Sequence, residues 1–295
     1  YSIENDILRL TVDSHGAEPV SVIHKPTGAE LLWQADPAVW KRHAPILFPY
    51  TGKLTGGKML AKGVEYAGGQ HGFARDVEHT MTHHADNLLE FELHANAETL
   101  PKWPYAFVLR STFTLEGETV HHTLTVENPV EDKLCFGIGY HPAFALPFDD
   151  RHVTEDYEIR FDGVESPLCV SAQPNGLLNG QSYYLARNVE AIQLTDDLFD
   201  NDSHAMVNLR SAHVSVIEKD TGRSVICDVS DFPYTLIWSA PKKPLHFICI
   251  EPWHSLPGEE NGPHRLGAAP LRRDPEEGRE LVHHAVHDLC PLKVR

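Results

Sequence analysis

Short runs in which apolar and polar residues alternate recur along the whole chain, and turn residues separate them. A period of two is that of a β-strand with one buried face, and two such runs around a turn predict a β-hairpin. Three segments have this pattern: 107–126 with a turn at 116–119, 214–229 with a turn at 219–222, and 20–33 with a turn at 25–28. The chain is therefore expected to consist mainly of antiparallel strands.

Helical patterns are sparse by comparison. Residues 35–43 are expected to form one helical turn or two, residues 278–287 have a mixed pattern, and residues 257–278 are polar enough for a long surface loop. The 21 prolines and 20 glycines are spread along the chain rather than gathered in a linker. We therefore predict an all-β fold, a large antiparallel β-sandwich of two sheets, as a single domain over residues 1–295.

The charge balance argues against several classes of partner. The chain has 42 acidic and 25 basic side chains, for a formal charge of −17, with its 20 histidines counted as neutral. Nucleic-acid binding needs a basic face and docking to an anionic membrane needs a basic cluster, so neither partner is expected. The chain does not open with a basic and apolar leader, and apolar runs such as residues 247–250 are far too short for a membrane span. A soluble, cytoplasmic protein is therefore expected.

Motifs for metals and cofactors are also missing from the sequence. The five cysteines form no C-x-x-C pair and are expected to be small buried hydrophobic residues. No H-E-x-x-H motif, phosphate-binding loop, G-x-G-x-x-G fingerprint or G-x-S-x-G elbow occurs. We therefore expect no metal, no cofactor and no serine-hydrolase chemistry.

Three segments interrupt the strand pattern with polar groups in apolar or glycine-rich surroundings. His71 and Arg75 lie in a loop that follows two glycines, and an ordinary surface loop is the alternative interpretation. His141 follows an apolar strand and precedes Pro142, so it is either a general acid or base or a structural histidine. Glu251 directly follows four apolar residues, and it is either a carboxyl with a tunable pKa or a strand-end cap.

Several uncommon motifs occur in an order typical of one enzyme family. They are HGA at 15–17, LWQADP at 32–37, WKRHAP at 40–45, LFPYTGKL at 47–54, QHGFAR at 70–75, GYHPAF at 139–144, ND at 201–202, LIW at 236–238 and IEPW at 250–253. In this order they resemble the aldose 1-epimerase (galactose mutarotase-like) family, and most closely a bacterial branch with a G-x-H-P-A-F signature. The resemblance covers residues 1–255, and the segment after Trp253 follows the family pattern poorly.

The resemblance implies a large β-sandwich with a sugar cleft on one sheet and no cofactor. The family interconverts the α and β anomers of an aldose: a base removes the C1 hydroxyl proton while an acid protonates the ring oxygen, and the opened ring recloses on the other face. The matching positions are His141 as the acid and Glu251 as the base. The expected substrate-binding residues are Lys53, His71, Arg75, Asp202 and Trp238. Lys53 stands where the family usually has arginine, and the two differ at a bidentate contact.

Two alternatives stay open at this point. A mutarotase for a phosphorylated hexose would need a basic cluster, for which Lys53, Arg75 and the pair Lys41-Arg42 are candidates, but the charge of −17 disfavours an anionic substrate at long range. A carbohydrate-binding protein without catalysis could use the same fold, because a fold alone does not establish activity. The expected partner in each case is a small-molecule sugar, bound by a monomer or a homodimer.

Overall fold

The computed structural model describes residues 1–131, 134–262, 286–289 and 293–294. An eight-stranded sheet has the order β16 (Leu178–Tyr184), β15 (Leu168–Ala172), β18 (His204–Met206), β21 (Tyr234–Trp238), β22 (Phe247–Trp253), β12 (Gly139–Tyr140) and β5 (Ile46–Leu47), with β13 (Ala143–Ala145) also paired to β22. All pairs of named strands are antiparallel.

Four smaller sheets surround this one. One five-stranded sheet is formed by β23 (Val286–Leu289), β11 (Thr119–Glu127), β10 (Val108–Glu116), β9 (Leu88–His94) and β8 (Thr80–Ala85). The other is formed by β17 (Val189–Gln193), β14 (Tyr157–Glu165), β19 (His213–Glu218), β20 (Ser224–Asp228) and β24 (Lys293–Val294). A four-stranded sheet contains β1 (Ser2–Glu4), β2 (Leu8–Asp13), β3 (Glu18–His24) and β4 (Ala29–Glu30), and β6 (Lys58–Ala61) pairs with β7 (Val64–Ala67).

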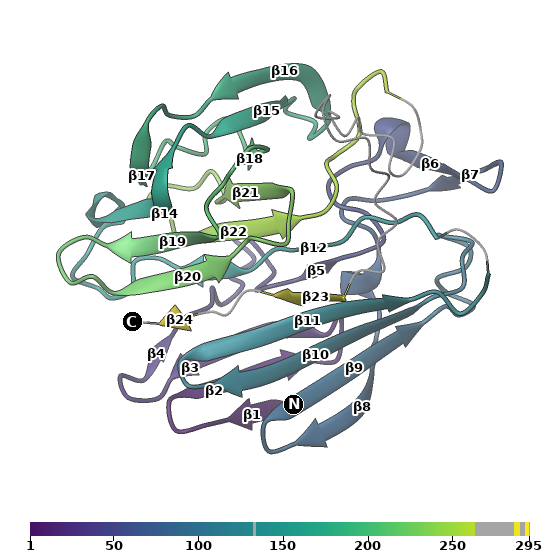
Figure 1. Cartoon of the computed structure of the whole chain (residues 1–295), viewed down its shortest axis with the longest axis horizontal. Coiled ribbons are helices and arrows are strands. Elements are labelled where there is room, and N and C mark those ends of the chain that lie inside the picture. Colours follow the sequence, from purple (N-terminus) through teal and green to yellow (C-terminus); the bar gives the residue numbers. More distant parts are fainter. Residues whose placement is uncertain (132–133, 263–285, 290–292, 295) are drawn as a thin grey trace.

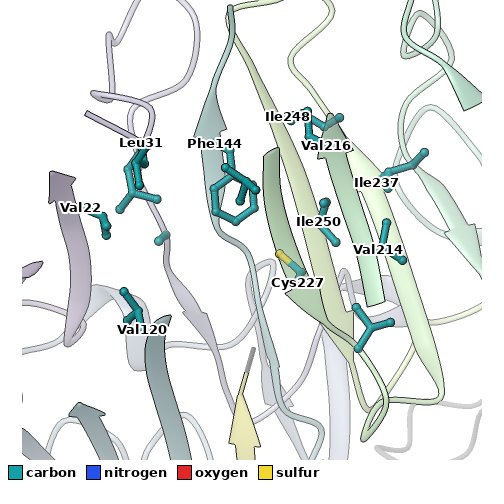
Figure 2. Close-up of a cluster of buried hydrophobic side chains, with 14 of the residues drawn as sticks. Val22, Leu31, Val120, Phe144, Val214, Val216, Cys227, Ile237, Ile248 and Ile250 are labelled. Atoms are coloured by element: carbon teal, nitrogen blue, oxygen red, sulfur yellow. The ribbon is translucent and has the colours of Figure 1, made fainter. Parts of the chain in front are cut away.

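The main core lies between these layers. Figure 1 shows β8–β11 in one layer of the molecule and β14–β22 in another. Buried side chains from both layers belong to a single hydrophobic cluster. Figure 2 shows Phe144 in this cluster, between Val22 on β3 and the pair Cys227 and Ile250 on β20 and β22. This cluster joins the eight-stranded, four-stranded and both five-stranded sheets, and three further clusters complete the apolar interior of the described residues. The all-β fold class is confirmed, but the strands are divided among five sheets rather than the two that the sequence predicts.

Strand β22 is the element that connects this core to the polar residues of interest. All seven of its residues are buried, so both of its faces are covered. Ile248 and Ile250 belong to the main core cluster, whereas Phe247 and Cys249 pack in a different cluster. Successive side chains of a strand point to opposite faces, so Glu251 shares the face of Phe247 and Cys249.

The three predicted hairpins are present. Strands β10 and β11 pair up to Glu116 and Thr119 at the turn, and β19 pairs with β20 as expected. Strands β3 and β4 form the third hairpin, in which the second strand is limited to Ala29–Glu30. The hairpins were predictable because the turn fixes the register of the two strands. In that register the alternating apolar residues of both strands lie on the same, buried face.

The helical expectations have mixed outcomes. Residues 35–43 contain no helix; they form one turn, in which the Trp40 N–H donates to the Asp36 carbonyl at 2.9 Å. Residues 263–285 lie outside the described part of the chain, and with them most of the expected loop at 257–278 and of the mixed segment at 278–287. The single domain over residues 1–295 stays a prediction. Within the described residues, the helical elements are the 3₁₀ turns η1 (Thr55–Gly57), η2 (Ala74–Asp76) and η3 (Thr154–Asp156), and none is long and apolar enough to cross a membrane.

The cysteines follow their prediction with one exception. Cys169, Cys227 and Cys249 are buried and free, as small hydrophobic residues would be. Cys135 is exposed, because it lies in the irregular segment between β11 and β12 rather than in a strand, and Cys290 lies outside the described residues.

Candidate active site

His141 and Glu251 meet because the segment before β13 runs beside β22. Gly139 pairs with Trp253 and Ala143 pairs with Cys249, which brings His141 opposite Glu251. The ladder is interrupted between these pairs because Pro142 has no N–H, and the His141 N–H donates instead to the Pro45 carbonyl at 3.1 Å. His141 Nε2 lies 3.3 Å from Glu251 Oε2.

Burial shifts the pKa of both groups toward the uncharged form. Only 2% of Glu251 and 6% of His141 is exposed. Desolvation, and after it the negative charge of Asp202, raises the pKa of Glu251 well above its usual value. Desolvation, and after it the positive charge of Arg75, lowers the pKa of His141 to about 3. Glu251 Oε2 has no short, well-aligned hydrogen bond within the described residues, although the nearby Trp253 side chain offsets part of the pKa shift.

His71 is held by a backbone conformation that its neighbour makes possible. His71 has φ of 66° and Gly72 has φ of 73°, and a Cβ on Gly72 would lie 2.0 Å from the Phe48 carbonyl oxygen. The N–H of Gly52 donates to His71 Nδ1 at 3.0 Å. Nδ1 is therefore the acceptor and Nε2 carries the proton of the neutral ring. Burial, and next the charge of His141, lowers the pKa of His71 well below 6.5, which keeps the ring neutral.

Aromatic side chains enclose His141. Trp40 stacks on the imidazole with ring centroids 5.0 Å apart and planes 22° apart. Trp238 and His71 each present an edge, at 5.6 Å and 5.5 Å. His71 in turn packs edge-on against Trp253 at 5.3 Å. These rings leave the imidazole with apolar walls, which accounts for its desolvation.

Hydrogen bonds to residues earlier in the sequence hold the segment that contains Trp40 in place. The Trp33 indole N–H donates to the Trp40 carbonyl at 2.7 Å. The buried carboxylate of Glu18 accepts hydrogen bonds from the backbone N–H groups of His43 and Ala44 at 2.7 and 2.9 Å. These contacts fix residues 40–45 next to His141.

Three basic side chains lie around His71 and contribute to its pKa shift: Arg75, Arg42 and Lys53. The guanidinium of Arg75 is 12% exposed and donates to the Gln70 carbonyl, and burial together with Arg42 lowers its pKa to about 10. Arg42 pairs with Asp76 at 2.5 Å. Lys53 is half-buried beside Gly176, and within the described residues its ammonium makes no ion pair or hydrogen bond. A strongly acidic protein thus concentrates positive charge at this place.

The structure therefore brings the expected site residues to one region. His71, His141, Glu251 and Trp238 are in contact or joined through His141, and Lys53, Arg75 and Asp202 are close enough to shift the pKa of His71 or Glu251. Two neighbours were not predicted as site residues. Trp40 lies in the motif WKRHAP, to which the sequence assigns no role. Cys249 is predicted only as a buried hydrophobic residue, although it lies two residues before Glu251 on a strand, which places both side chains on one face.

Fold and site together define a β-sandwich protein with a buried acid–base couple between aromatic walls. The family model for aldose 1-epimerases matches residues 1–264, and the chain belongs to this family of isomerases. The plasmid-encoded protein LacX of Lactococcus lactis subsp. lactis is 33% identical over 262 residues, which are 86% of this chain and 87% of LacX.

Solved structures agree with this assignment. The galactose mutarotase related enzyme from Lactobacillus acidophilus has a TM-score of 0.86 and 29% identity, and the match covers 99% of this chain and 92% of that one. A galactose mutarotase-like protein from Lactobacillus casei ATCC 334 has a TM-score of 0.83 and 32% identity, with 89% and 90% covered. The predicted family and its β-sandwich fold are confirmed, whereas the assignment to a branch with the G-x-H-P-A-F signature stays a prediction.

Proposed function

We propose that this protein is an aldose 1-epimerase in which His141 is the general acid and Glu251 the general base. The observation that carries the assignment is the 3.3 Å approach of His141 Nε2 to Glu251 Oε2 in a site where both are buried. The C1 hydroxyl and the ring oxygen of a pyranose are bonded to the same carbon. An acid and a base that converge this closely can therefore act on both oxygens at once.

The protons balance within the couple. Glu251 as carboxylate takes the C1 hydroxyl proton while His141 as imidazolium gives its proton to the ring oxygen, so the C1–O5 bond breaks and an aldehyde forms. Rotation about the C1–C2 bond presents the other face. As the ring recloses, the hydroxyl at C5 returns its proton to His141 and Glu251 returns its proton to the C1 oxygen. The couple passes from charged to uncharged and back without a change in its net charge. The pKa shifts favour the uncharged form, which is the form that coexists with the open-chain sugar.

The surrounding residues supply binding and orientation. The Nε2–H of neutral His71 and the guanidinium of Arg75 donate hydrogen bonds to sugar oxygens, and the carboxylate of Asp202 accepts them from hydroxyls. Trp238 provides an apolar surface for the sugar ring. Positioned acid or base groups each contribute about 10²–10⁴-fold to a rate, and the two transfers here are the largest contributions that we assign.

Anomer exchange measured by polarimetry, or by NMR of the anomeric proton, tests this assignment. Glu251→Gln and His141→Asn should each lower the rate by about 10²-fold or more, with an unchanged fold. The matched controls are Glu92→Gln and His94→Asn, because this pair on β9 has a similar contact of 2.8 Å but lies outside the site. Full activity in both site variants would show that the roles are wrongly assigned. Tight sugar binding by the native protein without faster exchange would indicate a carbohydrate-binding protein.

A phosphorylated sugar is the second candidate substrate, and the basic cluster favours it. Arg42, Lys53 and Arg75 place three positive charges around His71, and the Lys53 ammonium has no protein partner among the described residues. Comparing kcat/KM for glucose and glucose 6-phosphate separates the two classes. If the phosphate is bound, Lys53→Met should raise KM for the phosphorylated sugar by about 10-fold, as expected for loss of a charge-assisted hydrogen bond, and leave glucose unaffected.

We also infer a cytoplasmic location, because Cys169, Cys227 and Cys249 are free and such thiols are typical of reducing compartments. The proposed partner is a small-molecule sugar, bound by a monomer or a homodimer. Cell fractionation and the mass in solution test these two statements.

A further inference from the structure

A thiol lies against the proposed acid–base couple. Cys249 precedes Glu251 by two residues on β22, so both side chains occupy the same face of the strand. The ligand atoms of His141, Cys249 and Glu251 all lie within 4.8 Å of one another, and all three residues are buried. The proposed reaction uses His141 and Glu251 but gives the thiol no part.

We propose that His141, Cys249 and Glu251 form a binding site for Zn²⁺, and that zinc bound there inhibits the isomerase. A neutral imidazole, a thiolate and a carboxylate are ligands that zinc takes in proteins, and three protein ligands leave a fourth position for water or a sugar hydroxyl. Inhibition rests on the proposed function, because the metal ties up the acid and the base together. Binding does not depend on that function.

The distances fit a tetrahedral ion. Bonds of about 2.0–2.1 Å to nitrogen and oxygen and 2.3 Å to sulfur separate the N and O ligands by about 3.3–3.4 Å, and sulfur from either by about 3.6 Å. His141 Nε2 and Glu251 Oε2 are already 3.3 Å apart. Within the 4.8 Å limit of the group, the sulfur has to approach by about 1.2 Å at most, which a side-chain rotation supplies.

A second group of potential ligands shows what distinguishes this site. Asp149, His152 and Glu218 also lie within 4.8 Å of one another. There, however, the guanidinium of Arg223 donates to Asp149 Oδ2 and to Glu218 Oε2, each at 2.7 Å. A cation would have to displace that arginine. Glu251 Oε2, in contrast, is buried and has no short, well-aligned hydrogen bond in the described part of the chain, where no arginine or lysine pairs with it either. A metal there would compete only with the contact of the Trp253 side chain.

Zinc entry has a defined proton balance. The metal binds a thiolate, a carboxylate and a neutral imidazole, so any protons held by the Cys249 thiol and by the His141–Glu251 couple leave to solvent. Calorimetry in buffers of different ionisation enthalpy should therefore detect proton release when zinc binds near neutral pH. Affinity should rise with pH for the same reason.

Absorption spectroscopy with Co²⁺ tests the binding directly, because the 20 histidines of the chain can bind metal weakly elsewhere without producing a thiolate signal. The native protein should show a thiolate-to-cobalt charge-transfer band at one equivalent, and zinc should abolish it. The band should be absent in Cys249→Ala and present in Cys227→Ala, in which another buried free cysteine is removed. Glu251→Gln should keep the band but weaken cobalt affinity by at least about 10-fold, so the site is testable even if Cys249→Ala does not fold.

Exchange kinetics test the inhibition. Zinc should inhibit the native enzyme, EDTA should restore the rate, sugar should protect, and Mg²⁺ should have no effect because it prefers oxygen ligands. Relative to its own rate without metal, Cys249→Ala should need at least about 10-fold more zinc for half-inhibition than the native enzyme. Absence of the cobalt band, or equal inhibition of the native enzyme and Cys249→Ala, would overturn the proposal. If the protein catalyses no anomer exchange, the cobalt titration still decides whether the site exists.

Discussion

The most specific structural requirement in the site is the absence of a side chain at Gly72. A Cβ there would lie 2.0 Å from the Phe48 carbonyl oxygen, and ordinary contact starts at 3.4 Å, so Gly72→Ala must displace the loop by about 1.4 Å. That displacement moves His71, and a misplacement of about 1 Å can cost 10²-fold in rate. An alanine with a φ of 73° lowers the free energy of unfolding by about 1–2 kcal/mol, and the close contact lowers it by about 1–3 kcal/mol. Gly72→Ala should therefore be destabilised by about 2–5 kcal/mol in total.

Gly28 offers a matched control for this substitution. Its φ is 72°, nearly that of Gly72, but a Cβ there meets nothing within 4 Å. Gly28→Ala should therefore cost only the conformational part, about 1–2 kcal/mol, with full activity. Urea unfolding gives the two free energies and polarimetry gives the two rates. If Gly72→Ala unfolds like Gly28→Ala and keeps the native rate, the proposed packing of the His71 loop against Phe48 is wrong.

Two further perturbations concern single side chains. Trp40→Leu keeps an apolar wall beside His141, and with it the desolvation, but removes the aromatic face that favours the protonated imidazole by about 0.5–2 kcal/mol. The kcat should therefore fall about 2- to 30-fold and its pH profile should move toward acid, while Trp40→Phe retains most of the rate. A profile that is unchanged in Trp40→Leu would contradict this. His152 has its pKa raised, first by Asp149 and then by Asp220 and Glu218, so its stabilising contribution is complete below pH 6.5 and is lost as pH rises through the raised value. The melting temperature of His152→Gln should thus lie further below that of the native protein at pH 6 than at pH 9, and an equal difference at both would exclude the ion-pair explanation.

The sequence predicted the strands well because each hairpin carries its own evidence in a period of two and a turn. It also identified His71, His141 and Glu251 as candidates, since each interrupts an apolar or glycine-rich segment. The sequence could not predict Trp40 as a site residue, because it lies in an irregular turn. The position of that turn depends on the Trp33 hydrogen bond and on the distant Glu18 carboxylate.

The sequence also could not predict which distant segments pair with each other. The burial of Cys249 was predicted correctly, but its neighbours depend on the pairing of β13 with β22, which no local pattern encodes. The same limit applies to the basic cluster, because Lys53, Arg42 and Arg75 lie on three separate segments outside the strands. Local patterns predict elements and candidate groups, whereas distances between groups come from the tertiary pairing.

The burial of β22 on both faces determines the order in which the parts of the site lose their structure. Backbone amides in a strand that is buried on both faces exchange with solvent only when much of the sheet opens, so the carboxyl of Glu251 is anchored to the most slowly opening part of the molecule. His71 and Lys53 belong to loops and Arg75 belongs to the short 3₁₀ turn η2, and the local opening of such segments costs less free energy. Moderate denaturant should therefore weaken sugar binding well before the catalytic strand exchanges its amides. Sequence changes in the loops can likewise alter the preferred sugar without loosening the strand that carries the proposed base.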